Sequence, residues 1–251
     1  MRCKNVVKAL CYRAFRGLFA EKGRIIEMLL YPVASLMIWG LFLYADIVAT
    51  DVARDLFLIN MVWGVMTMIQ VQANNVMMHD LWSREFPELF RSGIDTTSYL
   101  IAMLTFGIVM GIIGTVLFSF LSLLFFGLSV QDLLPLFISF PCFLLFALGL
   151  AVFAAAIIIR LNQTYGFIAF NLLTFIVMLS SPYVPVEKLP VVLQKIASAS
   201  PLGMIFEYIR HGDLNLLYTS ALLSCLLLLV SFCFYRYSFK RLRQKGNIFS
   251  L

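Results

Sequence analysis

The stretch LLPLFISFPCFLLFALGLAVFAAAIII, residues 133–159, runs for 27 residues without a charged side chain. About 20 apolar residues in a helix are enough to span the ~30 Å hydrocarbon core of a bilayer. A segment this long and this apolar therefore predicts a helix that crosses a membrane. Five further apolar runs flank it, at residues 25–44, 56–78, 99–126, 165–179 and 216–235.

The composition agrees with a chain that is mostly embedded in lipid. Hydrophobic residues make up 62% of the 251 residues and charged residues only 13%, against roughly 25% charged in soluble domains. Six helices of ~20 residues use most of the chain, so no stretch remains for a separate soluble catalytic domain. We expect an all-α, polytopic membrane protein with six transmembrane helices, forming a single domain over residues 1–251.

Basic residues set the expected orientation. The head, residues 1–24, carries seven Lys or Arg, and the tail, residues 236–251, carries five. With both ends inside, the inner segments hold 15 basic residues and the outer segments 4, and the positive-inside bias favours this arrangement over its reverse. We expect a multi-pass protein of the plasma (inner) membrane with both termini in the cytoplasm. The expected partners of the basic ends are membrane lipids rather than nucleic acid.

The head also has a helical pattern. Residues 1–24 bring Val7, Leu10, Ala14 and Leu18 to one face at helical spacing, among the basic residues. This arrangement predicts a cytoplasmic amphipathic helix that lies in the membrane interface.

The fifth apolar run, residues 165–179, is too short to cross the bilayer as a helix. Its 15 residues reach only about 22 Å, short of the ~30 Å core. Residues 181–213, which follow, fit either an outer re-entrant segment or an ordinary outer loop with a short interfacial helix, and the short run favours the first. A re-entrant segment needs its non-helical backbone buried in protein or facing water. The residues expected to shape this segment are Pro182, Pro185, Pro190, Pro201, Glu207 and Arg210.

The sequence lacks the patterns of a catalytic or metal site. His79 and His211 fall on opposite faces of the membrane in this topology, and no His, Cys, Asp and Glu cluster has metal-ligand spacing. There is no phosphate-binding Gly-x-x-x-x-Gly-Lys-[Ser/Thr] loop and no Gly-Lys pair. We therefore expect no catalytic, cofactor or metal site in this chain, so any ATP that drives it must bind another chain. The scarcity of ionisable residues in the spans argues against an ion-coupled carrier.

Uncharged amides interrupt the apolar runs. Asn60, Gln70 and Asn74 lie in the second run and Asn171 in the fifth. Amides seldom face lipid, because unmet hydrogen bonds are costly there. We expect these side chains either to hydrogen-bond between helices or to line a substrate path or dimer seam.

Small residues recur at a spacing of four in two of the runs. This spacing brings small side chains to one face of a helix, where they permit close approach of a second helix. The residues are Gly107 and Gly111 in the third run and Ala147, Ala151 and Ala155 in the fourth.

Residues 79–98 form a polar loop that is cytoplasmic in this topology and contains REFPELFRSG at residues 84–93. Its apolar side chains can gather on one side of a short helix, with the charged ones elsewhere; the apolar set is Trp82, Phe86, Leu89 and Phe90. The helix is either one more interfacial helix or a docking helix that fits a groove on a soluble partner. Its mixed charge differs from a lipid-binding polybasic segment. The candidate coupling residues are Leu81, Trp82, Arg84, Glu85, Phe86, Glu88, Leu89 and Phe90.

Together these features resemble the type-2 ABC exporter permeases, the family of the drug-resistance, nodulation-factor and polysaccharide export permeases. The resemblance covers nearly the whole chain and rests on the basic N-terminal helix, the six runs and the loop at 84–93. Near the end, SSPYVPVEKLP at 180–190, ASPL at 199–202 and EYIR at 207–210 match the family's order of a Pro-containing stretch, a Leu-Pro, a Pro-Leu and a Glu/Arg-bearing helix. One departure is Phe86-Pro87, where many members have a Gly-Thr pair.

The resemblance implies a permease subunit without its own ATPase site. Two copies, or this chain and a similar one, would pair with two ATP-binding subunits that carry ATP and Mg. The loop at 79–98 would rest on the ATP-binding subunit, whose closure would shift the population of permease conformations. The charge-poor spans suit an amphipathic, lipid-linked or polysaccharide-type substrate moved outward. An ATP-independent channel or carrier and a membrane-embedded enzyme or assembly scaffold stay as alternatives.

Overall fold

The computed structural model describes residues 2–20, 22–45, 50–161 and 166–244. Within these ranges the chain forms helices and turns and contains no strand, which confirms the all-α prediction. The helices are, in chain order, α1 (Arg2–Ala20), α2 (Lys22–Tyr44), α3 (Thr50–Trp82), α4 (Phe86–Arg91), α5 (Thr96–Phe125), α6 (Leu134–Leu161), α7 (Phe167–Leu179), the 3-10 helix η2 (Val186–Lys188), α8 (Val191–Ala199), α9 (Pro201–His211) and α10 (Leu214–Gln244).

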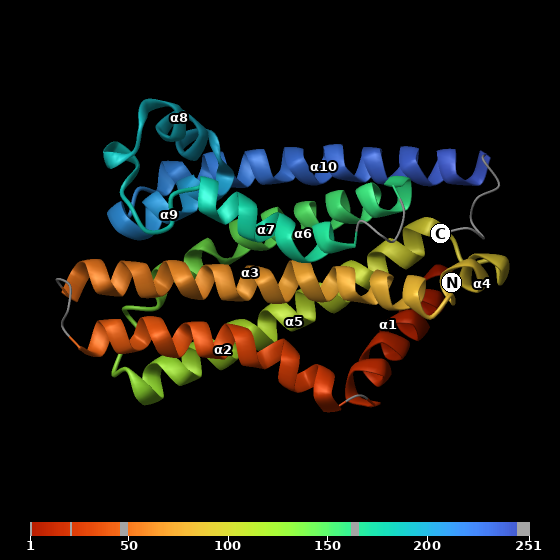
Figure 1. The fold of residues 1–251 in the computed structure, drawn as a ribbon, viewed down its shortest axis with the longest axis horizontal. Coiled ribbons are helices and arrows are strands. Elements are labelled where there is room, and N and C mark those ends of the chain that lie inside the picture. Colours follow the sequence, from red (N-terminus) through yellow and green to blue (C-terminus); the bar gives the residue numbers. More distant parts are fainter. Residues whose placement is uncertain (1, 21, 46–49, 162–165, 245–251) are drawn as a thin grey trace.

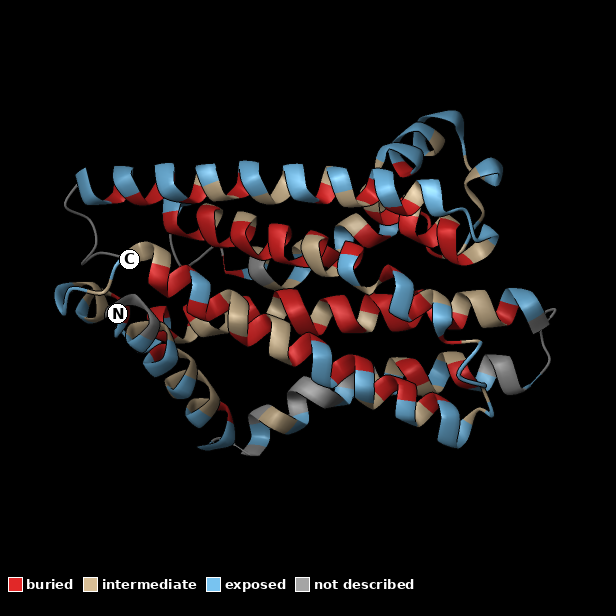
Figure 2. Ribbon diagram, turned by 180° about the vertical axis from the view of Figure 1, so that it is seen from behind, coloured by how far each residue is buried: buried red, intermediate tan, exposed pale blue. Residues whose placement is uncertain are grey.

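The long helices lie side by side in a bundle whose two ends differ (Figure 1). The short helix α4, the first helix α1 and the C-terminal end of α10 lie at one end, here called the α4 end. The helices α8 and α9 lie at the other. In the centre, α3 contacts α2, α5, α6 and α7, and α10 packs along α6. Figure 2 shows the resulting burial, with α3 mostly covered and the outer face of α10 exposed.

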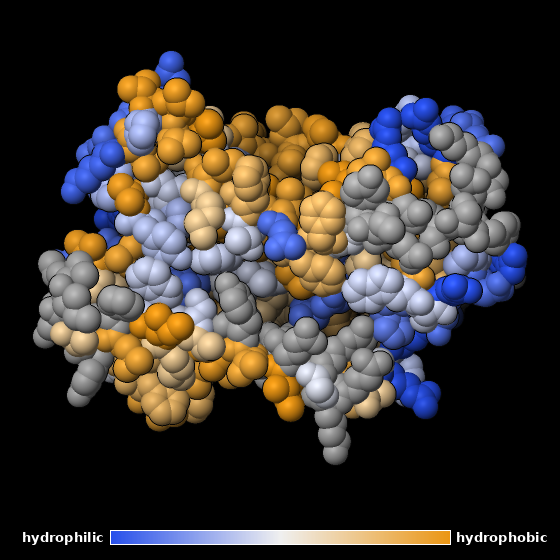
Figure 3. Space-filling model, in the orientation of Figure 1, coloured by the Kyte–Doolittle hydropathy of each residue, from blue (hydrophilic) through white to orange (hydrophobic). Residues whose placement is uncertain are grey.

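In the part of the chain that the structure describes, four helices are long and apolar enough to cross a membrane: α3 from Asp51 onward, α5, α6 and α10. Most residues in the apolar segments of α5 and α10 are half-buried or exposed rather than fully buried, and Figure 3 shows apolar surface across the middle of the molecule with polar surface gathered toward its ends. This distribution suits a surrounding of lipid. The helices α2 and α7 lie beside α3 but are not among the four, so the count of six spans stays a prediction.

Three predicted boundaries need correction. Helix α3 continues past Met78 to Trp82, because no Gly or Pro interrupts it, so the start of the predicted loop is helical. Helix α7 has only 13 residues and reaches about 20 Å. Helix α10 continues nine residues beyond Tyr235. Lys and Arg are good helix formers, and their charge is favourable near the C-terminal end of a helix. The end of the predicted basic tail, 245–251, lies outside the described residues.

The predicted close contacts of small residues are confirmed. A Cβ added at Gly107 would lie 2.7 Å from the carbonyl oxygen of Ile69 and 2.9 Å from the Cβ of Ala73, so glycine lets α5 touch the backbone of α3. The alanines of α6 are completely buried. The apolar face of α1 packs against α5, where Leu10 and Leu18 are both buried. Whether α1 also lies in the membrane interface stays a prediction.

Asp95 caps the start of α5. Its backbone is extended, with φ −81° and ψ 151°, and its carboxylate accepts the backbone N–H of Ser98 at 3.0 Å. Hydrogen bonds from the side chain and the backbone of Ser98 lower the pKa of Asp95 below its ordinary value.

We predict that Asp95→Ala lowers the free energy of unfolding by about 1 kcal/mol, whereas Asp95→Asn, an equally good cap, keeps most of it. The measurement is SDS titration in mixed micelles. Because folding lowers the pKa of this carboxyl, its contribution is complete above about pH 4 and is lost as the pH falls through the lowered pKa. The Asn variant should not show this loss. Equal destabilisation by Ala and Asn would contradict the cap.

Candidate functional site

Helix α4 is anchored to the bundle by aromatic side chains. Phe86 is completely buried, and its ring centre lies 5.6 Å from that of Tyr99 and 6.1 Å from that of Phe239. Phe90 lies 4.9 Å from both Phe86 and Phe239. Pro87 stands in the first turn, where its missing N–H has no helical partner to lose. These four rings, the aromatic cluster, attach α4 to the start of α5 and the end of α10.

The opposite face of α4 is charged and exposed. Arg84, Glu85, Glu88 and Arg91 all lie at the surface, and Glu88 pairs with Arg91. Arg84 has a left-handed backbone, φ 59°, at the point where the chain reverses from α3 into α4. The candidate coupling residues are therefore divided between buried aromatic anchors and a polar outer face.

Trp82 does not gather with the other apolar residues of this segment, and that prediction is wrong. It is the last residue of α3 and is 59% exposed. Its ring stacks instead on Phe170 of α7, at 6.3 Å and 17°. The neighbouring Leu81 is buried. The reversal follows Trp82, so the indole lies on a different helix from Phe86 and Phe90.

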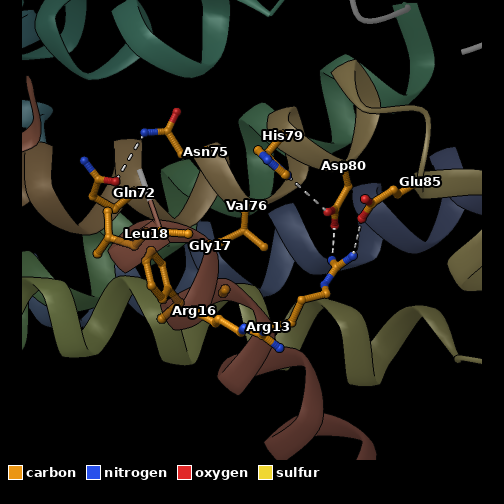
Figure 4. Close-up of a pocket in the computed structure, with 13 residues that line it drawn as sticks. Arg13, Arg16, Gly17, Leu18, Gln72, Asn75, Val76, His79, Asp80 and Glu85 are labelled. Atoms are coloured by element: carbon orange, nitrogen blue, oxygen red, sulfur yellow. Dashed lines mark hydrogen bonds and ion pairs between the residues drawn. The ribbon is translucent and has the colours of Figure 1, made fainter. Parts of the chain in front are cut away.

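A buried carboxylate joins α1, α3 and α5. Asp80 is only 2% exposed and accepts hydrogen bonds from Arg13 Nη2 at 2.5 Å and from the hydroxyl of Tyr99 at 2.7 Å. The second guanidinium nitrogen, Nη1, donates to Glu85 Oε2 at 3.0 Å. Figure 4 shows Arg13 reaching from α1 toward both carboxylates. This ion network links the N-terminal helix to the end of α3 and to the residue that precedes α4.

Beside the ion network, α1 and α3 border an open cavity of about 330 Å³ (Figure 4). Two arginines, Arg13 and Arg16, and two carboxylates line it. Asn75 and Gln72, also in its wall, hydrogen-bond to each other at 3.2 Å. The charges in this cavity balance, and its lining side chains hydrogen-bond to one another. We therefore interpret the cavity as part of the contact between α1 and α3.

The four amides assigned to a substrate path or dimer seam lie in different surroundings. Asn60 is buried and accepts the hydroxyl of Ser35 at 3.0 Å, which joins α3 to α2. Gln70 and Asn74 are completely buried in α3, and neither amide atom of Asn74 has a hydrogen-bond partner among the described residues. Asn171 is exposed and bonds to the backbone of its own helix. Asn60 thus forms a hydrogen bond between two helices. A substrate path or dimer seam lined by these amides stays a prediction.

Arg210 holds residues 181–213 together. Its side chain is 8% exposed, and Nη1 lies 2.6 Å from Glu207 Oε1. Its Nη2 donates to the carbonyl oxygens of Ser181 at 3.0 Å and Pro182 at 2.9 Å. Ser181 has a left-handed backbone, φ 58°. Arg210 thereby connects α9 to the turn that follows α7.

Three of the four prolines in residues 181–213 mark the starts of helices. Pro185 and Pro190 are the residues before η2 and α8, and Pro201 is in the first turn of α9. The helix α9 buries one face against α6 and α10, whereas α8 buries only Ala197. Whether the segment re-enters the bilayer or lies at its surface stays a prediction.

The two histidines lie at opposite ends of the bundle, as predicted. His79 Nδ1 is 3.9 Å from Asp80, near the α4 end, and His211 Nε2 is 3.2 Å from Glu207 in α9 (Figure 1). Within the described part of the chain, no group of three or more His, Cys, Asp or Glu is placed to hold a metal ion.

A helical bundle with long, apolar, partly exposed helices and a charged helix at one end defines a multi-pass membrane protein. The model of the ABC-2 type transporter family matches residues 5–214. The chain therefore belongs to the ABC-2 type transporter family, whose members are the transmembrane components of ABC transporters and typically pair with an ATP-binding subunit. The match confirms the resemblance to type-2 ABC permeases. No curated protein matches the chain.

Proposed function

We propose that this chain is the membrane-spanning permease subunit of an ATP-driven exporter in the plasma (inner) membrane. It would cross the bilayer six times with both termini in the cytoplasm and would pair with a second permease. Two ATP-binding subunits would carry ATP and Mg. The substrate would be amphipathic, lipid-linked or of polysaccharide type, and would move outward. Family membership and the excess of basic residues at the two ends support this proposal.

The observation that carries the proposal is the construction of α4. Its buried face is fixed to α5 and α10 by the aromatic cluster, and its exposed face carries both signs of charge. A helix anchored in this way cannot move without moving the helices that hold it, because packed aromatic side chains transmit displacement. A soluble partner bound to the charged face would therefore act directly on the bundle.

The ion network extends this connection. Glu85, the residue directly before α4, and Asp80, in α3, share the guanidinium of Arg13, so α1 would follow any displacement of α4. ATP would do work by making the partner bind one arrangement of the permease better than another. A preference of about 1.4 kcal/mol shifts the ratio of two conformations tenfold.

Charge reversal on the outer face of α4 tests the docking role. We predict that Glu88→Lys leaves the folded permease intact, because the side chain is exposed, but weakens retention of the ATP-binding subunit about tenfold. The matched control is Glu187→Lys, which reverses an exposed charge in η2 at the opposite end. The measurements are co-purification of the two subunits and ATP hydrolysis in liposomes.

Two outcomes would count against the proposal. Retention of the ATP-binding subunit by Glu88→Lys, or an equal loss in both variants, would remove α4 as the docking element. Transport by the purified permease in liposomes without nucleotide would favour the alternative of an ATP-independent channel or carrier.

A further inference from the structure

A basic cavity of about 550 Å³ lies between the end of α10 and the start of α5. Arg236, Lys240 and Arg243 of α10 line it, together with Thr96, the first residue of α5. The three cations are four and three residues apart, so they share one face of α10. Its seven lining residues include no carboxylate. This distinguishes it from the cavity beside α1, where two carboxylates offset two arginines.

The walls of this basic cavity are held in place. The hydroxyl of Tyr235 reaches the carbonyl oxygen of Thr96 at 3.5 Å, which joins α10 to α5. Phe239, in the wall, is 2% exposed and belongs to the aromatic cluster. The guanidinium of Arg243 lies over the Phe239 ring at 5.7 Å, and that of Arg236 lies 5.8 Å from the ring of Phe232. Such cation–π contacts orient a guanidinium without neutralising it.

The three cations of this cavity are not paired with a carboxylate of the described residues. Within the described residues, Arg236, Lys240 and Arg243 form no ion pair. Asp95, next to Thr96 in the chain, is engaged as the cap of α5. Cations also favour the C-terminal turn of a helix, but that effect fades within one turn. It therefore cannot account for Arg236, eight residues before the end of α10.

The length of α10 places the cavity at the level of the lipid headgroups. Its 31 residues extend about 46 Å, some 16 Å more than the ~30 Å hydrocarbon core. Exposed apolar side chains run along the helix up to Val230, and the cations begin at Arg236. Tyr237 is 53% exposed beside them, which is typical of the boundary between hydrocarbon and water.

We propose that this cavity binds the phosphodiester headgroup of an anionic phospholipid. The acyl chains would lie along the exposed apolar face of α10, and the phosphate would meet Arg236, Lys240 and Arg243. Guanidinium and ammonium groups bind phosphate oxygens through short charge-assisted hydrogen bonds. A bound headgroup would lie against Phe239, and so next to the rings that anchor α4.

The test measures lipid binding by the purified full-length permease in detergent. The probe is dioctanoyl phosphatidylglycerol, followed by native mass spectrometry. We expect Lys240→Gln to raise its dissociation constant about fivefold, and the double variant Arg236→Gln/Lys240→Gln about twentyfold or more. The matched control is Arg241→Gln, an exposed cation of the same turn that does not line the cavity. It should stay within about twofold of the parent.

Two further probes separate the possible sources of the phosphate. Dioctanoyl phosphatidylcholine, which has no net charge, and inorganic phosphate should each bind at least about tenfold more weakly than phosphatidylglycerol. Inorganic phosphate binding as tightly would make this a site for a free anion and overturn the lipid assignment. Equal losses in Lys240→Gln and Arg241→Gln would indicate diffuse attraction and also overturn it. Since neither nucleotide nor ATP-binding subunit is present, the outcome is independent of the proposed transport function.

Discussion

Arg13→Ala is expected to lower the free energy of unfolding by about 2 to 3 kcal/mol. The reason is the carboxylate that it leaves behind: Asp80 is 2% exposed and would keep only Tyr99 as a close hydrogen-bond donor. Removal of one partner from a buried ion pair costs about 3–5 kcal/mol, because the other charge stays buried without compensation. The side chain of Arg13 is 35% exposed, so water can replace part of its effect, and we expect a cost at or below the lower end of that range.

A second substitution separates the loss of the ion pair from the loss of packing. Asp80→Asn removes the charge and retains an oxygen that can accept from Tyr99. We therefore expect the double variant Arg13→Ala/Asp80→Asn to be more stable than Arg13→Ala alone. The control is Arg16→Ala, which removes an exposed cation of the same helix and should cost less than about 0.5 kcal/mol. Strictly additive effects in SDS titration would contradict a direct interaction.

The bundle was predictable because lipid leaves the backbone few choices. Residues 133–159 cannot satisfy their backbone hydrogen bonds in hydrocarbon except as a helix, and α6 covers nearly the same range. The single apolar face of α1 followed from the spacing of Val7, Leu10, Ala14 and Leu18, because three- and four-residue steps share one side of a helix. Both features depend on local pattern, which a single sequence contains.

The details of the α4 end depend on contacts between distant parts of the chain. Arg13 and Asp80 are 67 residues apart, and no local pattern pairs them. A carboxylate two residues after the end of an apolar run was still a usable signal, since a buried carboxylate requires a cation. The position of Trp82 was missed for a different reason. The chain reverses through Arg84 at φ 59°. This left-handed conformation favours glycine, so an arginine at this position gives no sequence signal for the turn.

The segment at residues 181–213 provides the second large effect. Arg210→Met is expected to lower the free energy of unfolding by about 2 to 3 kcal/mol, because methionine keeps the unbranched apolar stem of the side chain but none of its hydrogen bonds. The carbonyl oxygens of Ser181 and Pro182 would lose their donor. Glu207 would retain only His211, at 3.2 Å. The matched control, Lys195→Met, removes an exposed cation of α8 and should cost less than about 0.5 kcal/mol.

Two companion variants identify which bonds of Arg210 matter. Glu207→Gln leaves the bonds to the carbonyl oxygens intact and should cost less than Arg210→Met. Arg210→Lys should recover only part of the loss, because one ammonium cannot reproduce the two-sided geometry of a guanidinium. Since α8 buries only Ala197, loss of this tie should open the segment locally, so limited proteolysis within residues 181–213 should accelerate before the bundle unfolds. If Arg210→Met were no more sensitive to protease than Lys195→Met, the packing of α9 on α6 and α10 would be sufficient to hold the segment without this arginine.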